Sequence, residues 1–144
     1  MKTEIVRTFA ALNATNEAIL YAKSPDELYR KVSEAAFFSG DFLAAAIFLL
    51  QPGSDLLRFA AGCGNDVARL RSIDISVVAG TPEGSGVCGQ AFREQRLIVS
   101  NDFLTDARSQ AWRDGAKAGQ TVKTTLLSAF GQSVPFLSCT SQVV

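Results

Sequence analysis

The feature that most constrains the fold is a nine-residue apolar run, FLAAAIFLL, at residues 42–50. A run of this length without polar alternation is typical of a strand buried on both faces, and it is too short for a membrane span, which needs about 20 residues. The turn-forming residues QPGSD follow at once, and LLRFAAGCG at 56–64 predicts a second strand. Because the turn is so short, the two strands predict an antiparallel hairpin.

Two helices are predicted before this hairpin. Residues 4–22 place apolar side chains on one helical stripe: Ile5, Phe9, Leu12, Ala18, Ile19 and Ala22. In the second helix Ser24 is the expected N-cap, Pro25 takes the first helical position and Glu27 stands at the capping-box distance, with Gly40 as the end.

The rest of the chain predicts shorter elements. They are strands at 73–78 and 97–102, helices at 87–96 and 105–119, and a closing hairpin within 121–144. Pro135 lies in the last run and predicts an edge strand or a bulge there. The order of elements favours one α+β domain over residues 1–144, with an antiparallel sheet and segregated helices.

Composition excludes several functions. Fourteen basic residues balance fourteen acidic ones, so we expect no nucleic-acid partner. The absence of histidine removes the commonest general base and metal ligand. The three cysteines form no C-x-x-C pair, so no metal site and no cofactor are expected. The N-terminal residues carry early charges and no signal-peptide apolar region, which indicates a cytoplasmic chain without membrane insertion.

The stretch GSGVCG at residues 84–89 fits the dinucleotide-binding pattern G-x-G-x-x-G. Asp102 follows Gly84 by 18 residues, near the spacing of a ribose-binding acid. However, TPE separates the glycines from the preceding strand, and only 42 residues follow Asp102, too few for a doubly wound sheet. A dinucleotide site is therefore the weaker hypothesis for this loop.

Two segments together resemble the GAF family of small sensory domains. NATNEAILYAKSPDELYRKVSEAA (13–36) is similar to the start of bacterial GAF modules, and GSGVCGQAFREQRLIVSNDFLTDAR (84–108) is similar to the family's glycine loop, helix, strand and D-x-R turn. The resemblance covers roughly residues 9–120, while residues 121–144 match the usual last strands poorly. It implies a GAF-like central antiparallel sheet of about six strands with helices packed on it.

The resemblance also implies a small-molecule pocket between the sheet and the loops and helices that follow its third strand. Carried over to this sequence, the expected ligand-binding residues are Ala46, Phe48, Cys63, Cys88, Asp102 and Trp112. Each of these residues also has a structural interpretation. Phe48 and Trp112 would be core residues, and Asp102 would stabilise a turn. The N-K-F-D-E signature of cyclic-nucleotide-binding GAF domains is absent, and without histidine neither a bilin beside a Cys-His pair nor a histidine-ligated haem is expected.

The resemblance points to a non-catalytic sensory or regulatory domain of bacterial signal transduction, from a parent such as a diguanylate cyclase or a sensor histidine kinase. The amphipathic helix at 1–22 would pair in a homodimer or link to another domain, or else bury its stripe within the chain. The alternative function is an enzyme similar to the free methionine-(R)-sulfoxide reductases, which carry GVCG and would use Cys88. Two features oppose this alternative. That family has a partner for the cysteine ten residues before it, where this sequence has Val78, and a catalytic cysteine in a later loop, whereas residues 107–119 contain no cysteine.

Overall fold

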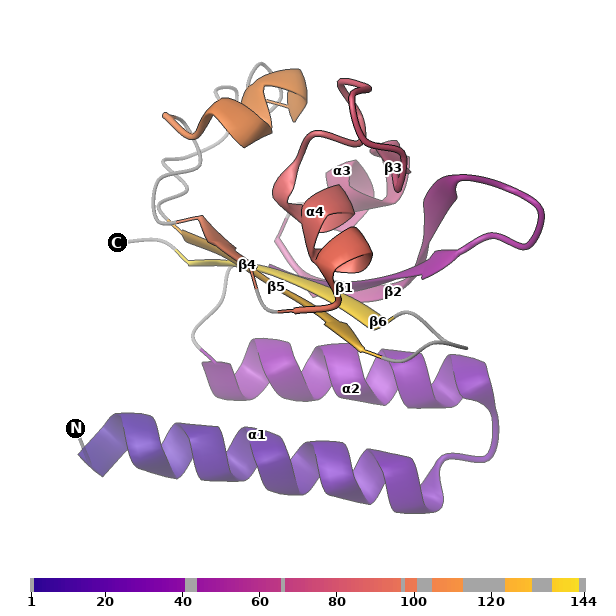
Figure 1. Ribbon diagram of the computed structural model, residues 1–144. Coiled ribbons are helices and arrows are strands. Elements are labelled where there is room, and N and C mark those ends of the chain that lie inside the picture. The colour runs from indigo at the N-terminus through magenta and orange to yellow at the C-terminus, as the bar shows by residue number, and fades with distance from the viewer. Residues whose placement is uncertain are drawn as a thin grey trace.

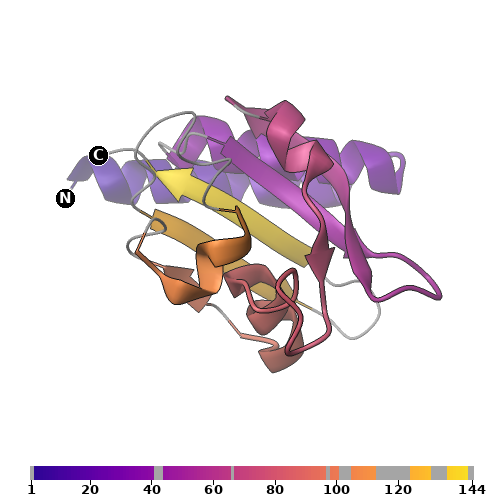
Figure 2. The same cartoon turned by 90° about the horizontal axis from the view of Figure 1, so that it is seen from above.

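The computed structural model of the protein describes residues 2–40, 44–65, 67–96, 98–100, 105–112, 124–130 and 136–142. A sheet lies between two groups of helices (Figure 1). Helices α1 (Lys2–Tyr21) and α2 (Pro25–Gly40) lie on one side, and α3 (Val67–Ser72), α4 (Val87–Glu94) and the 3-10 helix η1 (Ala107–Trp112) lie on the other. Seen from above, α1 and α2 run behind the sheet, with the shorter helices in front of it (Figure 2).

The strands are β1 (Ala44–Leu50), β2 (Leu56–Gly64), β3 (Ile75–Ser76), β4 (Ile98–Ser100), β5 (Thr124–Phe130) and β6 (Phe136–Gln142). Their order across the sheet is β3-β2-β1-β6-β5-β4, and each pairing between neighbours is antiparallel. The α+β class with an antiparallel sheet is therefore confirmed. Helix α2 packs on β1 and β2, and α1 packs on α2.

The apolar run forms β1 as predicted, and the QPGSD turn joins it to β2. Residues 44–48 are all buried, which fits a strand covered by α2 on one face and by the short helices on the other. Gly53 in the turn has φ +72°, a left-handed conformation that glycine adopts without steric cost. The pairing shifts between Ile47 and Phe48, which face Ala61 and Phe59, so β2 carries one extra residue at a bulge.

Helix α2 begins at the predicted cap. The Ser24 hydroxyl accepts the Glu27 backbone N–H at 3.1 Å, which satisfies one of the donors left free at a helix start. The Glu27 carboxylate accepts the backbone N–H of Lys23 at 2.9 Å. In a capping box it would instead accept the N–H of the N-cap residue, Ser24. Its other oxygen lies 2.8 Å from the ammonium of Lys31.

Two expectations need correction. The helix predicted at 105–119 is the short 3-10 helix η1, which starts after Asp106; residues 113–119 lie outside the described residues. The expectation of an edge strand after Pro135 is wrong, because β6 pairs with β1 on one side and with β5 on the other. The strand begins at Phe136, so the proline nitrogen is not needed in the ladder. Among the described residues, no helix is both long and apolar enough to cross a membrane.

Candidate functional site

The face of the sheet beneath α3 and α4 carries the core of the described structure. Its fully buried members are Ala46, Phe48, Leu57, Ile75, Val87, Ala91 and Ile98. The Phe48 ring is 0% exposed and meets the Phe59 ring edge to face, with centroids 5.9 Å apart. The guanidinium of Arg71 from α3 lies 5.0 Å from the centroid of the Phe59 ring, within cation–π range. Side chains therefore fill the space over Phe48.

Three of the six predicted ligand-binding residues lie together at this face. Ala46 and Phe48 belong to the core cluster, and Cys88 packs against the cluster from the first turn of α4. Asp102 lies outside the described residues, as does the side chain of Trp112, the last residue of η1.

Cys63 is not brought to this face. Its partner in β1 is Ala45, the neighbour of Ala46, and successive side chains of a strand point to opposite faces of a sheet. Burial raises the pKa of the Cys63 thiol above its ordinary value, and the carboxylate of Glu34 on α2 raises it further. Cys63 therefore lies on the side of the sheet that α2 covers, away from Cys88.

The glycine loop is a tightly packed turn. A Cβ on Gly84 would collide with the backbone carbonyl oxygen of Val78, and a Cβ on Gly89 would lie 2.6 Å from the carbonyl oxygen of Gly84 and 2.7 Å from that of Ser76. Gly86 is the N-cap of α4, with extended backbone. Two of the three glycines are thus required by close backbone approach. With antiparallel pairing throughout the described strands, the loop has no parallel strand-helix-strand unit around it, as a dinucleotide fold requires.

Arg93 fastens this loop to α4. Its Nη1 donates to the carbonyl oxygen of Gly84 at 2.7 Å and to that of Val77 at 3.2 Å. Both acceptors belong to the loop that precedes α4. A side chain from the last turn of α4 therefore holds the loop that leads into the first turn of the same helix. The hydroxyl of Thr81 reinforces the turn by accepting the N–H of Gly84 at 3.1 Å.

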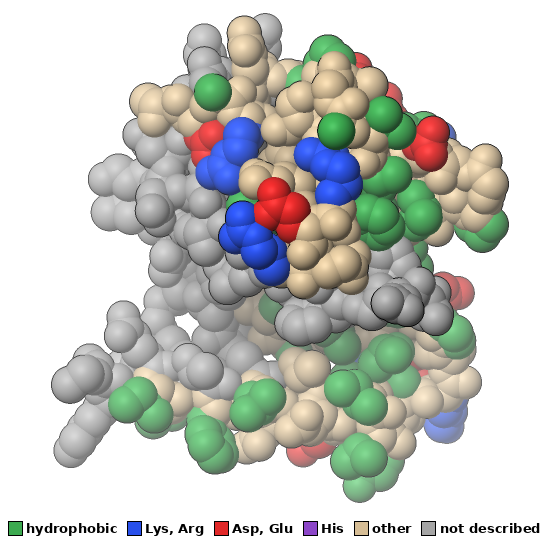
Figure 3. All heavy atoms as spheres, viewed as in Figure 1, with side chains coloured by type: hydrophobic (Ala, Val, Ile, Leu, Met, Phe, Trp, Pro, Cys, Tyr) green, Lys and Arg blue, Asp and Glu red, His purple; other side chains and the backbone are tan. Residues whose placement is uncertain are grey.

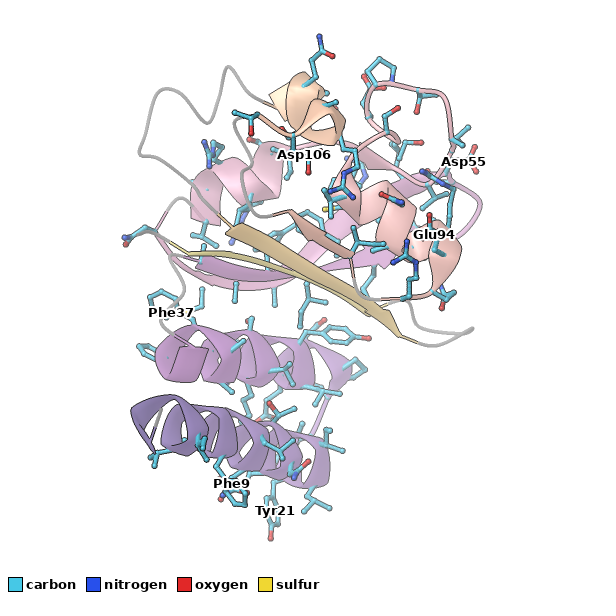
Figure 4. All side chains as sticks on the ribbon, turned by 60° about the vertical axis from the view of Figure 1, so that its left-hand side comes forward. Phe9, Tyr21, Phe37, Asp55, Glu94 and Asp106 are labelled. Atoms are coloured by element: carbon cyan, nitrogen blue, oxygen red, sulfur yellow. The ribbon has the colours of Figure 1, made fainter. Side chains whose placement is uncertain are left out.

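A second polar network joins α4 to η1. Arg108 makes two parallel bonds to Asp106, Nε to Oδ1 at 2.9 Å and Nη2 to Oδ2 at 2.7 Å, and its Nη1 donates to Gln90 Oε1 at 3.0 Å. Gln90 Nε2 in turn donates to Glu94 at 2.8 Å. Asp106 raises the pKa of Arg108, and hydrogen bonds from Gln90 and then Arg96 lower the pKa of Glu94. Figure 4 shows Asp106 just before η1 and Glu94 on α4, and charged side chains gather here on the surface (Figure 3).

The sequence pointed to only part of this network. The D-x-R turn at residues 106–108 belongs to the motif quoted above, and the spacing of Gln90 and Glu94 is typical of a bonded pair on a helix. Nothing in the sequence indicates that Arg93 reaches back nine residues or that Arg108 reaches Gln90 across 18.

The arrangement around Cys88 offers one thiol and no neighbouring histidine. Within the described residues, no group of three or more Cys, Asp or Glu side chains is placed to hold a metal ion. A groove of about 380 Å³ lies between α1 and α2, on the opposite side of the sheet from Cys88. Its lining includes Glu17, Lys31 and Phe38, and Lys31 is paired with Glu27.

This fold is that of a known class. The family model for the GAF domain matches residues 22–144, and the chain belongs to the GAF domain family. The match begins at residue 22, after α1. GAF domains commonly act in sensing and regulation and bind small molecules. Among curated proteins, none matches this chain.

Three solved structures illustrate the likeness. The free methionine-R-sulfoxide reductase from Neisseria meningitidis, solved in complex with its substrate, has a TM-score of 0.73 and 13% identity, over 96% of this chain and 74% of that one. The A. aeolicus nlh2 GAF domain in an inactive state has a TM-score of 0.70 and 12% identity, covering 96% and 82%. The GAF domain of a phosphoenolpyruvate-protein phosphotransferase from Coxiella burnetii has a TM-score of 0.73 and 11% identity, covering 94% and 79%. At such identities the likeness shows the fold alone.

Proposed function

We propose that this chain is a non-catalytic sensory or regulatory GAF domain of a cytoplasmic signalling protein. The domain binds a small molecule at the α4–η1 side of a sheet of about six strands. It works as a homodimer that forms through α1. Its output partner would be a diguanylate cyclase or a sensor histidine kinase domain. The observation that carries the proposal is the Arg108 network, because it couples η1 to α4 above the core. A ligand that binds one arrangement of these elements more tightly shifts the population toward it.

A ligand screen by thermal unfolding tests the proposal. A compound present at 100 times its dissociation constant adds about 2.7 kcal/mol to the free energy of unfolding, which raises the melting temperature measurably. Nucleotides and small metabolites are the compounds to screen. If no compound shifts the transition, the small-molecule part of the proposal is wrong.

A matched pair of variants locates any response. Arg108→Ala removes the link between η1 and α4 and should weaken the response to the compound. Arg30→Ala removes an exposed ion pair with Glu34 on α2 (2.9 Å), on the other side of the sheet, and should leave the response unchanged. Equal responses from both variants would place the ligand elsewhere.

The second candidate is an enzyme similar to the free methionine-(R)-sulfoxide reductases that uses Cys88. Two observations favour it: Cys88 lies at the start of α4 within GVCG, and two solved reductases share the fold. Val78 ten residues earlier and the lack of cysteine in residues 107–119 oppose it, because thiol redox chemistry needs a resolving partner. We expect no thioredoxin-coupled turnover of free methionine-(R)-sulfoxide. Turnover that disappears in Cys88→Ser would establish the enzyme instead.

A further inference from the structure

Helix α1 has two different faces. It packs on α2, and the described residues up to Tyr21 that are buried or half-buried are small: Ala14, Thr15 and Ala18, the last only 3% exposed. Six large apolar side chains of the same helix are instead between 55% and 72% exposed: Ile5, Val6, Phe9, Leu12, Ile19 and Leu20. Figure 4 shows Phe9 on the side of α1 that faces away from α2, and hydrophobic side chains line this outer helix in Figure 3.

The exposed face has the spacing of a helix–helix contact. Ile5, Phe9, Leu12, Asn16 and Ile19 follow one another at intervals of 4, 3, 4 and 3 residues, and all five are exposed. We call these five residues the α1 seam. This alternation corresponds to the a and d positions of a heptad, with Asn16 at an a position and Leu12 at a d position. At 1.5 Å per residue the seam is about 21 Å long.

The apolar area is large for a monomer. Six side chains of this size, each more than half exposed, present on the order of 600 Å² of apolar surface, which is the upper end for the largest patch on a soluble monomer. Two such faces in contact would bury on the order of 1,200 Å², the lower end of stable interfaces.

We propose that the α1 seam pairs with the same seam of a second copy, with the two helices parallel and in register. This inference rests on the homodimer of the proposed function and specifies its geometry. The seam has no charge, and the residues that flank it are uncharged as well: Val6, Asn13, Thr15 and Leu20. A self-complementary contact between identical helices therefore brings no like charges together, as a two-fold symmetric interface requires.

Asn16 selects the parallel arrangement. In parallel register Asn16 lies against the partner subunit's Asn16, and the two amides satisfy one another by hydrogen bonding. In an antiparallel pair centred on Leu12, Asn16 would instead lie opposite residue 8 and between apolar side chains, which leaves its amide without that partner. A single asparagine at an a position is a known determinant of register in parallel helix pairs.

A second copy fits this face better than a lipid surface. Helices that lie on membranes combine an apolar face with Lys and Arg on the polar face. Helix α1 carries two basic residues, Lys2 and Arg7, and two acidic ones, Glu4 and Glu17, so it lacks the excess of positive charge that draws a helix to an anionic membrane.

Sedimentation equilibrium over a concentration series tests the seam. Leu12→Lys places two ammonium groups opposite each other, and it should weaken dimerisation by about 100-fold, because juxtaposed like charges cost several kcal/mol. Ala10→Lys adds the same charge to an exposed position of α1 outside the seam and should leave the dimer unchanged. Far-UV circular dichroism checks that both variants are folded. A monomeric wild type overturns both the dimer and the seam, whereas a dimer equally stable in Leu12→Lys overturns the seam alone.

Cross-linking tests the direction. Under mild oxidation, Ile5→Cys should give a disulfide between the two copies of residue 5, identified by peptide mass spectrometry, because only the parallel pair brings these positions together. Ala10→Cys, outside the seam, should give little such product. A dimer that is weakened by Leu12→Lys yet forms no disulfide at residue 5 overturns the parallel register and leaves the homodimer of the proposed function intact.

Discussion

Helices α4 and α1 both have an apolar stripe, but they use it differently. The eight-residue α4 buries Val87 and Ala91 in the core against Phe48 and Ile98. The 20-residue α1 buries Ala18 on α2, while large side chains such as Phe9 remain in contact with solvent. The shorter helix is thus the one fixed to the sheet, and an amphipathic pattern alone does not say whether its partner belongs to the same chain.

The reason lies in the layers. Helix α4 contacts β3, β4, β5 and β6 directly, and Arg93 and Gln90 fasten it to the neighbouring loop and to η1. Helix α1 lies outside α2, which already covers the sheet, so only one side of it can meet the domain. The large residues of α1 lie on its other side. We therefore expect substitutions near α4 to change folding stability most, and substitutions on the outer helices to change it least.

The largest expected effect is at the centre of the α4 side. Phe48→Ala should lower the free energy of unfolding by about 3–5 kcal/mol, because it leaves a cavity in a fully buried cluster. Phe38→Ala on α2 is the matched control, because Phe38 is 76% exposed and its ring meets the Phe37 ring edge to face; its cost should be about 1 kcal/mol or less. Urea denaturation at one protein concentration measures both, and similar losses would break the contrast between the two sides.

The next effect is in the glycine turn. Gly84→Ala should cost about 1–3 kcal/mol, since the new Cβ meets the backbone of Val78 and that contact cannot be relieved by a side-chain rotation. Glu83→Ala, an exposed neighbour, should change stability by about 0.5 kcal/mol or less. If Gly84→Ala is as stable as the wild type, close approach is not the reason for a glycine there.

A smaller effect is expected at the start of α2. Ser24→Ala removes the hydroxyl that accepts the Glu27 N–H and should cost about 1 kcal/mol by chemical denaturation. Lys23→Ala keeps the backbone N–H that Glu27 accepts and is the control. A loss that equals that of Phe48→Ala would mean that this side of the sheet is as sensitive as the α4 side.

The smallest effect concerns pH. The bond from Lys31, and then the N–H of Lys23, lower the pKa of Glu27 below its ordinary value of 4.5. Because the folded-state pKa is the lower one, Glu27 contributes stability above about pH 4.5, and the contribution is lost as the pH falls through the folded-state value. The melting temperature of Glu27→Gln should therefore be below that of the wild type at pH 7 and should approach it as the pH is lowered below 4.5. A difference that persists in acid would point to a contact other than the charge.

Local sequence signals predicted much of the fold and less of the site. Ser24 before Pro25, and the turn around Gly53, located α2 and the β1–β2 hairpin because they act over a few residues. We expected Cys63 on the same face of the sheet as Cys88, but the structure places it on the other face. The face on which a strand residue lies depends on the pairing register, and a shift of one residue reverses it. The contacts of Arg93 with Gly84 and of Arg108 with Gln90 could not be predicted. Each joins residues that are far apart in the sequence, and the conformation of the chain between them does not follow from local patterns.

The sequence by itself determined most of the elements, the cap of α2, the antiparallel hairpin and the apolar stripes, because these follow from backbone geometry and the period of side chains along the chain. Only the tertiary structure decided which stripe is covered. Burial depends on the surfaces that the fold brings together, and here the sheet and α2 leave the large face of α1 in contact with solvent. The same pattern that forms a core at α4 thus forms an exposed seam at α1.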